Sequence, residues 1–463
     1  MSSSSTADEL FAKVGVRVPY TLLPADKVDK TKWAVIACDQ YTSEPDYWER
    51  VEQFVGDAPS TLRLMFPEVY LDKGHDEEIL KSISDHMAKY TAEGILVRPE
   101  KPGMVLVSRT TKTGATRTGL VTAVDLEMYD YSVGSQSKIR PTEATIESRI
   151  PPRLNVRRNA PVELPHIMVL IDDPEKAVLE PLFAKRDELK QVYDFDLMEN
   201  GGHLSGWWVD GESSQSAEVA KALNVIAEPE RFHKIYDAPA DKKPLIFAVG
   251  DGNHSLATAR AYWQEVKATL TDPEEIATHP ARFALVEIEN IHDDGLAFEA
   301  IHRLIFNANG GSRKFITDMT QFFEKEGCGP VTVSETEEDF KKAVKGEGSG
   351  HSFGYMVDGV KGGVFVANPK KVLDVATVMD FVDPYIKENE ANGTKIDYVH
   401  GLTAIERYCT AGTSNVGIVL PDMHKSDLFK TVVHDGALPR KTFSMGEADE
   451  KRFYYECRKI RKD

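Results

Sequence analysis

The hydrophobic and polar positions along the chain predict a mixture of strands and helices. Short apolar runs bounded by turn residues are typical of buried strands, and such runs lie at 33–41, 103–111, 116–129, 166–172, 281–293, 330–333 and 415–420. Longer segments read as helices, and they lie at 45–56, 76–94, 174–193, 372–390 and 402–410 and on both sides of the strand within 313–345. Glycine-punctuated hairpins are expected at 201–211 and 346–368.

The order of these elements favours an α+β fold with mixed sheets. The strands are too numerous and too irregularly spaced for a regular succession of parallel strands and crossover helices. We expect an N-terminal α/β region over 1–130, a core over 131–310, and a C-terminal α+β region over 311–463 that completes the site.

The stretch PLIFAVGDGNHSLATARAYWQ, residues 244–264, raises a chemical question. A buried strand at 245–249 leads into an amphipathic helix at 256–264, and the intervening turn carries glycines, an aspartate and a histidine. Such a turn presents free backbone N–H groups and the positive end of the helix dipole. It is therefore a candidate anion site.

Each side chain of this turn has a candidate role. We expect the Gly252 N–H and His254 to line a cavity, where the imidazole donates to a phosphoryl oxygen or moves a proton. A bare phosphate would repel Asp251, so a metal ion, a substrate hydroxyl or an amine is its expected partner. A plainer interpretation stays open, in which Asp251 or Asn253 merely caps the helix.

Charge narrows the classes of function. The net charge of −18 argues against a bulk nucleic-acid binder, because phosphate contacts need clustered Lys and Arg. One basic segment nevertheless stands out at 137–160, and it is either an anion pocket or a solvated, ion-paired face. Its cations are Lys138, Arg140, Arg149, Arg153, Arg157 and Arg158.

Targeting and redox signals are sparse. The longest apolar runs are too short to cross a bilayer, and the N-terminus has neither an apolar core nor an Arg-rich amphipathic pattern, so we expect a cytoplasmic protein. The four cysteines are scattered and form no CxxC, which indicates reduced thiols rather than a disulfide framework or a zinc site.

Four short motifs resemble one family in the same order along the chain. VGDGNHSLATA (249–259) resembles the Asp-Gly-His-His-Arg signature of the family catalogued as the domain of unknown function numbered one thousand and fifteen, a signature shared with ParB-like free serine kinases. IRPTEATI (139–146) resembles the Pro-His-Glu segment of those proteins. FEAIHRLIF (298–306), which includes a helix-like apolar run, and GALPRKTFSM (436–445) resemble the family's Pro-Thr-His-Arg-Leu-Val and Pro-Lys-Ser-Thr segments.

The resemblance implies a ParB/serine-kinase-like core and a set of site residues. Glu143 would be the general base, and Asp251, Gly252 and His254 would meet the transferring phosphates, with Asp251 also the candidate ligand of Mg²⁺. Asn253 and Ser255 depart from the family's histidine and arginine, and the lost arginine removes a bidentate phosphate clamp. Replacement cations and further phosphate or substrate contacts are expected at Asn253, Ser255, Arg140, Arg149, Arg153, His302, Arg303, Lys441 and Thr442.

Thr142 likewise replaces the histidine that precedes the family's glutamate. The implied function is phosphoryl transfer on a small hydroxylated amino acid, with serine or phosphoserine expected, ADP or ATP as the nucleotide and Mg²⁺ as its companion. The direction, kinase or phosphatase, stays open, as does an oligomer. Two alternatives remain, namely a nucleotide-binding regulatory protein that has lost catalysis and a ParB-like nucleic-acid-associated protein. We expect Glu143, Asp251, His254 and at least one cation to share a pocket.

Overall fold

The computed structural model describes residues 6–71, 73–74, 76–132 and 134–462. The chain divides into two compact units. Unit 1 takes in the chain up to Leu296 together with the segment from Gly446 onward, and unit 2 is Ala297–Met445. These bounds differ from the three regions expected from the sequence, because the C-terminal segment returns to unit 1 rather than completing a C-terminal region.

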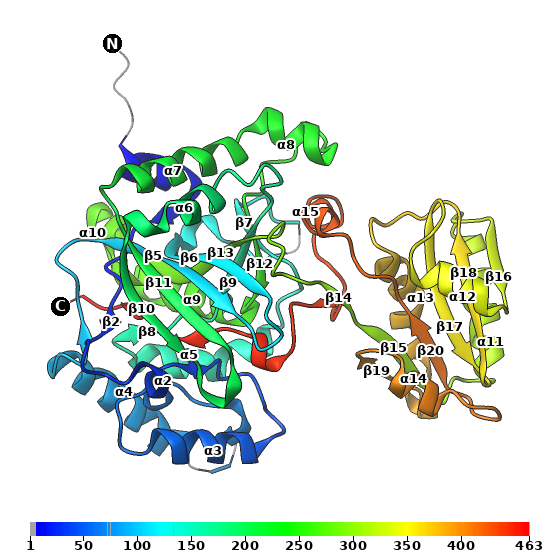
Figure 1. The fold of residues 1–463 in the computed structure, drawn as a ribbon. Helices are drawn as coiled ribbons and strands as arrows, with labels where there is room; N and C mark the ends of the chain where they lie inside the picture. Colours follow the sequence, from blue (N-terminus) through cyan, green and yellow to red (C-terminus); the bar gives the residue numbers. More distant parts are fainter. Residues whose placement is uncertain (1–5, 72, 75, 133, 463) are drawn as a thin grey trace. The chain divides into compact units, whose positions relative to one another are not determined.

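Unit 1 is built on one mixed sheet (Figure 1). Antiparallel and parallel pairs occur side by side, since β12 is antiparallel to β9 but parallel to β7. The α+β class with mixed sheets is thus confirmed. In spatial order the strands are β10 (Lys190–Asp196), β11 (His203–Asp210), β5 (Gly103–Thr110), β6 (Thr116–Asp125), β13 (Phe283–Asn290), β9 (Met168–Ile171), β12 (Phe247–Asp251) and β7 (Ile139–Pro141), with β1 (Val16–Arg17) also on β6.

Helices and small strand pairs surround this sheet. The helices of unit 1 are α1 (Ala7–Val14), α2 (Lys30–Trp33), α3 (Pro45–Val55), α4 (Asp76–Ala92), α5 (Ile150–Asn159), α6 (Glu180–Ala184), α7 (Ser214–Ile226), α8 (Pro229–Tyr236), α9 (Asn253–Lys267) and α10 (Pro273–Thr278). The small pairs are β2 (Leu23–Pro24) with β4 (Leu96–Val97), β3 (Val35–Ile36) with β22 (Phe453–Tyr454), and β8 (Val162–Glu163) with β23 (Arg458–Lys459).

Unit 2 has its own sheet and helices. Its strands in spatial order are β16 (Val331–Ser334), β18 (Val360–Val366), β17 (His351–Val357), β20 (Val416–Val419), β15 (His302–Phe306) and β19 (Lys395–Val399), and β14 (Glu299–Ala300) pairs separately with β21 (Phe443–Ser444). Its helices are α11 (Ser312–Lys325), α12 (Glu337–Val344), α13 (Asp374–Asn389), α14 (Thr403–Tyr408) and α15 (Lys425–His434).

Two predicted helices are wrong. The charged stretch 174–193 contains the short α6, with Pro181 in its first turn, and a 3₁₀ turn at Arg186–Glu188. From Lys190 onward it forms β10, the edge strand paired with β11. The helix-like run before His302 is extended instead and gives β14 and β15. In both places strand pairing overrides a weak local preference. The strand predicted at 33–41 is reduced to the two residues of β3.

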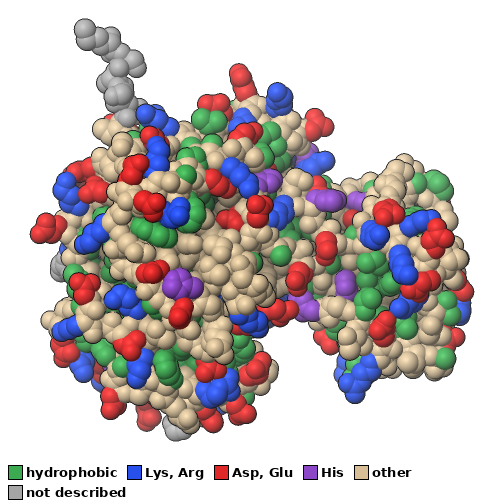
Figure 2. All heavy atoms as spheres, in the orientation of Figure 1, with side chains coloured by type: hydrophobic (Ala, Val, Ile, Leu, Met, Phe, Trp, Pro, Cys, Tyr) green, Lys and Arg blue, Asp and Glu red, His purple; other side chains and the backbone are tan. Residues whose placement is uncertain are grey.

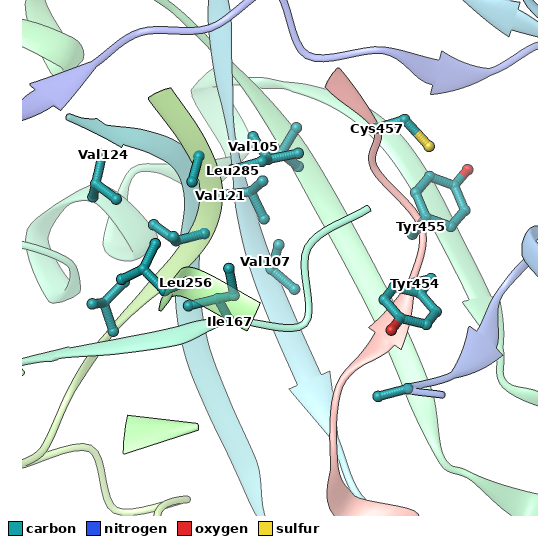
Figure 3. Packing of buried hydrophobic residues seen from close by; sticks show 14 of the residues in the cluster. Val105, Val107, Val121, Val124, Ile167, Leu256, Leu285, Tyr454, Tyr455 and Cys457 are labelled. Carbon is teal, nitrogen blue, oxygen red and sulfur yellow. The ribbon is translucent and has the colours of Figure 1, made fainter. Parts of the chain in front are cut away.

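The core of unit 1 includes its C-terminal segment (Figure 3). Side chains from that segment belong to the same buried cluster as residues of the sheet and of α9. The labelled members of this cluster are Val105, Val107, Val121, Val124, Ile167, Leu256, Leu285, Tyr454, Tyr455 and Cys457.

The surface carries both signs of charge. On the face drawn in Figure 2, acidic and basic side chains are interspersed rather than gathered into one basic field. Within the described ranges, none of the helices has the length and apolar character needed to span a bilayer.

Candidate functional site

The strand-to-helix turn is tighter than its sequence suggests. β12 continues to Asp251 and α9 begins at Asn253, so Gly252 alone makes the turn. Gly252 has φ 79° and ψ 25°, and a Cβ placed there would lie 2.9 Å from the Cα of Ile167. Both the left-handed backbone and this close approach therefore require glycine.

Replacing this glycine should destabilise unit 1. We expect Gly252→Ala to lower the free energy of unfolding by about 2–5 kcal/mol, from about 1–2 kcal/mol of left-handed strain and about 1–3 kcal/mol of overpacking. Gly94→Ala is the matched control, because its φ is 65° but an added Cβ would meet no described atom within 4 Å. Urea titration followed by tryptophan fluorescence measures both, and equal losses in the two variants would contradict the close-approach argument.

The segment carrying Glu143 runs alongside this turn. β7 is parallel to β12, with Pro141 opposite Val249. Thr142 continues the pairing, since its N–H and its hydroxyl donate to the Val249 carbonyl at 3.3 and 2.7 Å. Glu143 is half-buried and follows at the same edge of the sheet as Asp251. The register therefore brings the candidate base to the candidate anion turn.

His254 links the same two segments. Its Nε2 accepts the backbone N–H of Ile146 at 3.3 Å. Burial lowers the pKa of His254, and the nearby guanidinium groups of Arg153 and Arg149 lower it further. A neutral imidazole that accepts at Nε2 carries its proton on Nδ1, so it keeps one donor. The cavity described below does not have His254 among its described lining residues. The structure therefore does not place His254 where the sequence led us to expect it.

The three arginines expected to replace the missing clamp differ in position. The Arg140 guanidinium is buried and donates to the carbonyls of Ser137 and Lys243 at 2.8 and 2.9 Å, so Arg140 is committed to the backbone. Arg149 is exposed at the start of α5. Arg153 pairs with Glu68. Arg149 and Arg153 are thus the two cations that remain beside His254.

Asp251 is held by groups that the sequence did not single out. Its Oδ1 accepts the Gly252 N–H at 2.8 Å, and its Oδ2 lies 3.3 Å from the Nζ of Lys451 in the C-terminal segment. Burial acts to raise the pKa of Asp251, but Lys451 and His166 outweigh it and hold the pKa below its ordinary value. The aspartate is therefore a stable anion with a built-in counter-cation.

This arrangement does not fit Mg²⁺ at Asp251. Magnesium needs several oxygen ligands at a cation position beside the carboxylate. Here the Lys451 ammonium occupies that position and the Gly252 N–H takes the other oxygen. Among the described residues, no cluster of three metal-ligating side chains includes Asp251.

A second carboxylate, that of Glu289, interacts electrostatically with Asp251. Glu289 on β13 is fully buried, and its Oε1 is 3.2 Å from the Nε of Arg117. Burial raises the pKa of Glu289 to about 7 against the pull of Arg117, and Asp293 and Asp251 add to the rise. The folded protein therefore holds a proton on Glu289 at pH values where an exposed glutamate has lost it.

This raised pKa predicts the sign of a pH effect on stability. Between the unfolded value near 4.5 and the folded value of about 7, the folded state binds more protons, so stability falls as pH rises. The contribution is at most about 3 kcal/mol. Glu289→Gln should flatten the loss between pH 5 and 8 in urea titrations, whereas Glu230→Gln, on an exposed side chain, should keep it. An unchanged slope in Glu289→Gln would contradict the assignment.

Sequence reasoning missed a hydrogen-bonded chain beside the turn. The Tyr454 hydroxyl lies 3.2 Å from the Cys38 Sγ and 2.9 Å from the His166 Nδ1, and the His166 Nε2 lies 2.9 Å from the Ser255 Oγ. Ser255, which was expected to contact phosphate, thus directs its hydroxyl to His166. Residues 288 positions apart meet here, and no local pattern marks them.

A cavity of about 180 Å³ opens beside this chain. Ser255 and Thr258 of α9 line it, together with residues of α5 and of the segments around 64–71 and 160–167. Its polar lining side chains are Cys38, Glu68, Arg153, Arg157, Glu163, His166, Ser255, Thr258 and Tyr454, and the remainder of the lining is mainly apolar.

The remaining candidates belong to unit 2 and have structural partners there. Arg303 is fully buried and donates to the carbonyls of Ile301, Lys441 and Arg440. Burial lowers the pKa of His302 to about 4, and its Nδ1 accepts the Leu420 N–H at 3.3 Å. The Thr442 hydroxyl donates to the Pro439 carbonyl at 2.6 Å. Arg303, His302 and Thr442 therefore hold the 439–442 loop and the adjoining strands, which is the structural alternative to substrate binding.

Comparison with solved structures finds distant likenesses. A conserved hypothetical protein from Pyrococcus furiosus is 11% identical, with a TM-score of 0.34 over 72% of this chain and 93% of that one. A free serine kinase in complex with AMP is 12% identical, with a TM-score of 0.36 over 73% and 92%. SbnI with a C-terminal truncation, from Staphylococcus aureus, is 10% identical, with a TM-score of 0.31 over 70% and 83%.

The family assignment rests on sequence. No curated protein matches the chain. The model of the family described as "Protein of unknown function (DUF1015)" matches residues 22–385, which is most of the chain. The match includes three of the four motifs and confirms the family resemblance, and the chain belongs to that family.

Proposed function

We propose that unit 1 transfers a phosphoryl group between a nucleotide, ADP or ATP, and the hydroxyl of a small amino acid, with serine as the fitting acceptor. The observation that carries this proposal is the register of β7 beside β12, which sets the Glu143 segment against the Gly252 turn. A base and an anion site at one edge of a sheet are the minimum that phosphoryl transfer needs.

The turn supplies the phosphate contacts. The first N–H groups of α9, a helix of 15 residues, have no acceptor within the helix and carry its positive dipole end. Arg149 and Arg153 add positive charge close enough to depress the pKa of His254. These groups take over the role of the arginine that Ser255 replaces.

Glu143 supplies the base. Its carboxylate takes the proton of the serine hydroxyl while the oxygen forms a bond to phosphorus and the bond to the nucleotide's bridging oxygen breaks. Lys451 pairs with Asp251 and keeps it ionised, which fixes the charge beside the Gly252 turn.

The test is ³¹P NMR on the purified full chain with ATP or ADP and serine, and separately with phosphoserine and the nucleotide products, in the presence of Mg²⁺. We expect a phosphoserine resonance to grow in the first case or to decay in the second. Nucleotide binding by calorimetry without any change in the phosphorus resonances would instead identify a regulatory binder, and an absence of binding would overturn the proposal.

His254→Ala should weaken nucleotide affinity and turnover together, because it removes the Nδ1 donor and the contact that holds Ile146. We expect a loss of about 10-fold or more in affinity, the size of one charge-assisted hydrogen bond. His86→Ala, at a half-buried histidine of α4, is the control and should leave both unchanged. Full affinity in His254→Ala would remove this residue from the site.

A further inference from the structure

The cavity beside Ser255 is lined mainly by apolar side chains. Its two arginines are each ion-paired, Arg153 with Glu68 and Arg157 with Glu163 at 2.5 Å, and Glu163 also pairs with Arg458. The rest of its wall is mainly apolar, with Leu, Met, Phe, Val and Pro side chains from 64–71 and α5. A volume of about 180 Å³ is below that of a drug-sized pocket and suits a short apolar group.

We infer one arrangement of protons for the hydrogen-bonded chain at the wall of this cavity. The Tyr454 hydroxyl donates its proton to the Cys38 Sγ and accepts the Cys38 N–H at 3.3 Å. Having no second proton, it accepts from the His166 Nδ1–H at 2.9 Å. The His166 Nε2 then holds a lone pair directed at the Ser255 hydroxyl, 2.9 Å away.

These contacts reproduce the working parts of a serine nucleophile. A hydroxyl, an imidazole acceptor within hydrogen-bond reach, and a third group that orients the imidazole are the parts such catalysis requires. Tyr454 is only 3% exposed and is packed in the core, so its hydroxyl holds the imidazole from a fixed position. Ser255 and His166 are only half-buried, which leaves the hydroxyl reachable from the cavity.

We propose that Ser255 is an acyl-accepting nucleophile and that the cavity binds the short apolar acyl group of an ester. This activity is separate from the proposed phosphoryl transfer and does not rest on it. Ser255 lies in the first turn of α9, where helix N–H groups are the nearest source of hydrogen bonds for an oxyanion.

The reaction is a two-step transfer to water. The Ser255 Oγ attacks the ester carbonyl as the His166 Nε2 takes its proton. The resulting tetrahedral intermediate collapses, and His166 returns the proton to the leaving alcohol. Water then attacks the acyl-serine with His166 again as base, which releases the carboxylic acid and restores the serine hydroxyl.

The test is covalent labelling with an ethyl fluorophosphonate, in which the serine oxygen bonds to phosphorus and fluoride leaves. Labelling is carried out on the full chain without nucleotide or amino acid, so its outcome is independent of the phosphoryl-transfer experiment. We expect the adduct on the peptide carrying Ser255, and hydrolysis of p-nitrophenyl butyrate that the labelling abolishes. Folded wild-type protein that acquires no adduct at Ser255 would overturn the proposal.

Matched variants distinguish a serine hydroxyl that His166 activates from one that is merely exposed to the probe. Ser255→Ala should lose the adduct, and His166→Gln should slow labelling by about 10²–10⁴-fold, as for loss of a general base. Ser82 is the control, because its hydroxyl is exposed and lies 3.4 Å from the His86 Nδ1 on α4. Ser82→Ala should label like the wild type. Equal labelling rates in His166→Gln and the wild type would overturn the proposal.

Tyr454→Phe tests the orienting role and guards against misfolding of the histidine variant, since it keeps the buried ring. We expect the inactivation rate constant to fall by about 10–100-fold, the range typical when a partner that orients an imidazole is removed. The probe's binding constant should stay unchanged, because the ring still fills its place beside the cavity. A weakened binding constant with an unchanged rate constant would show that Tyr454 has only a structural role. It would contradict the proposal that Tyr454 orients His166.

Discussion

Glu143→Gln is expected to reduce phosphoryl transfer by about 10²–10⁴-fold, the usual contribution of a general base. The amide matches the carboxylate in size and can still meet the substrate hydroxyl, but it cannot take its proton. This loss corresponds to about 3–5 kcal/mol of transition-state stabilisation. Nucleotide affinity should be nearly unchanged, because the phosphate contacts we propose are at the Gly252 turn, Arg149 and Arg153 and do not include Glu143. Coupled turnover assays and calorimetry measure the two effects separately.

Glu147→Gln is the matched control for this variant. It makes the same chemical change four residues along the chain, on an exposed side chain of the short 3₁₀ turn that precedes α5. Its turnover should equal that of the wild type. If Glu143→Gln turns over as fast as Glu147→Gln, then Glu143 is not the base, even if phosphoryl transfer itself is observed.

The parts of the fold that local pattern determines were predictable. α3, α4 and the β17–β18 hairpin lie within a few residues of their predicted places, because amphipathic spacing and glycine turns specify them without distant contacts. The β12–α9 junction was also found, for the same reason. The helix predicted at 174–193 was wrong, because β10 is extended through its pairing with β11, which begins 13 residues further along, rather than through its own composition.

The site was predictable only in outline. The sequence placed Glu143, Asp251 and His254 among the candidates through their motifs, but it could not tell a cation that faces a ligand from one buried against carbonyls. Arg140 and Arg303 are both buried and donate to backbone carbonyls. The residue type alone does not reveal this difference, because the surroundings of an arginine depend on which face of a strand it occupies and on what packs over that face.

The sequence predicted that the C-terminal region completes the site, but it did not show which residues of that region would do so. Lys451 reaches Asp251 from 200 positions away, and Tyr454 reaches His166 from 288. Their segment follows unit 2 along the chain, yet it belongs to unit 1 and contributes to its core. Only the three-dimensional fold brings these pairs together, because pairs so distant leave no periodicity.

The largest effect on stability is therefore expected in this inserted segment. Arg452 is 5% exposed and bridges two buried carboxylates, Glu287 and Glu456, the second at 2.6 Å, and its Nε donates to the Pro165 carbonyl at 2.9 Å. Arg452→Met keeps much of the side-chain volume but leaves both carboxylates buried without their cation.

Breaking a buried ion pair from one side typically costs about 3–5 kcal/mol, a large share of the stability of an ordinary domain. We expect Arg452→Met to lose this amount in urea titration. All five tryptophans lie in unit 1, so their fluorescence reports its unfolding alone. Arg158→Met is the control, since its pair with Glu265 is about half exposed and should contribute about 0–1 kcal/mol. Similar losses in the two variants would mean that the C-terminal segment does not depend on Arg452 to hold it in the core, and that apolar packing by Tyr454, Tyr455 and Cys457 is enough to keep Lys451 beside Asp251.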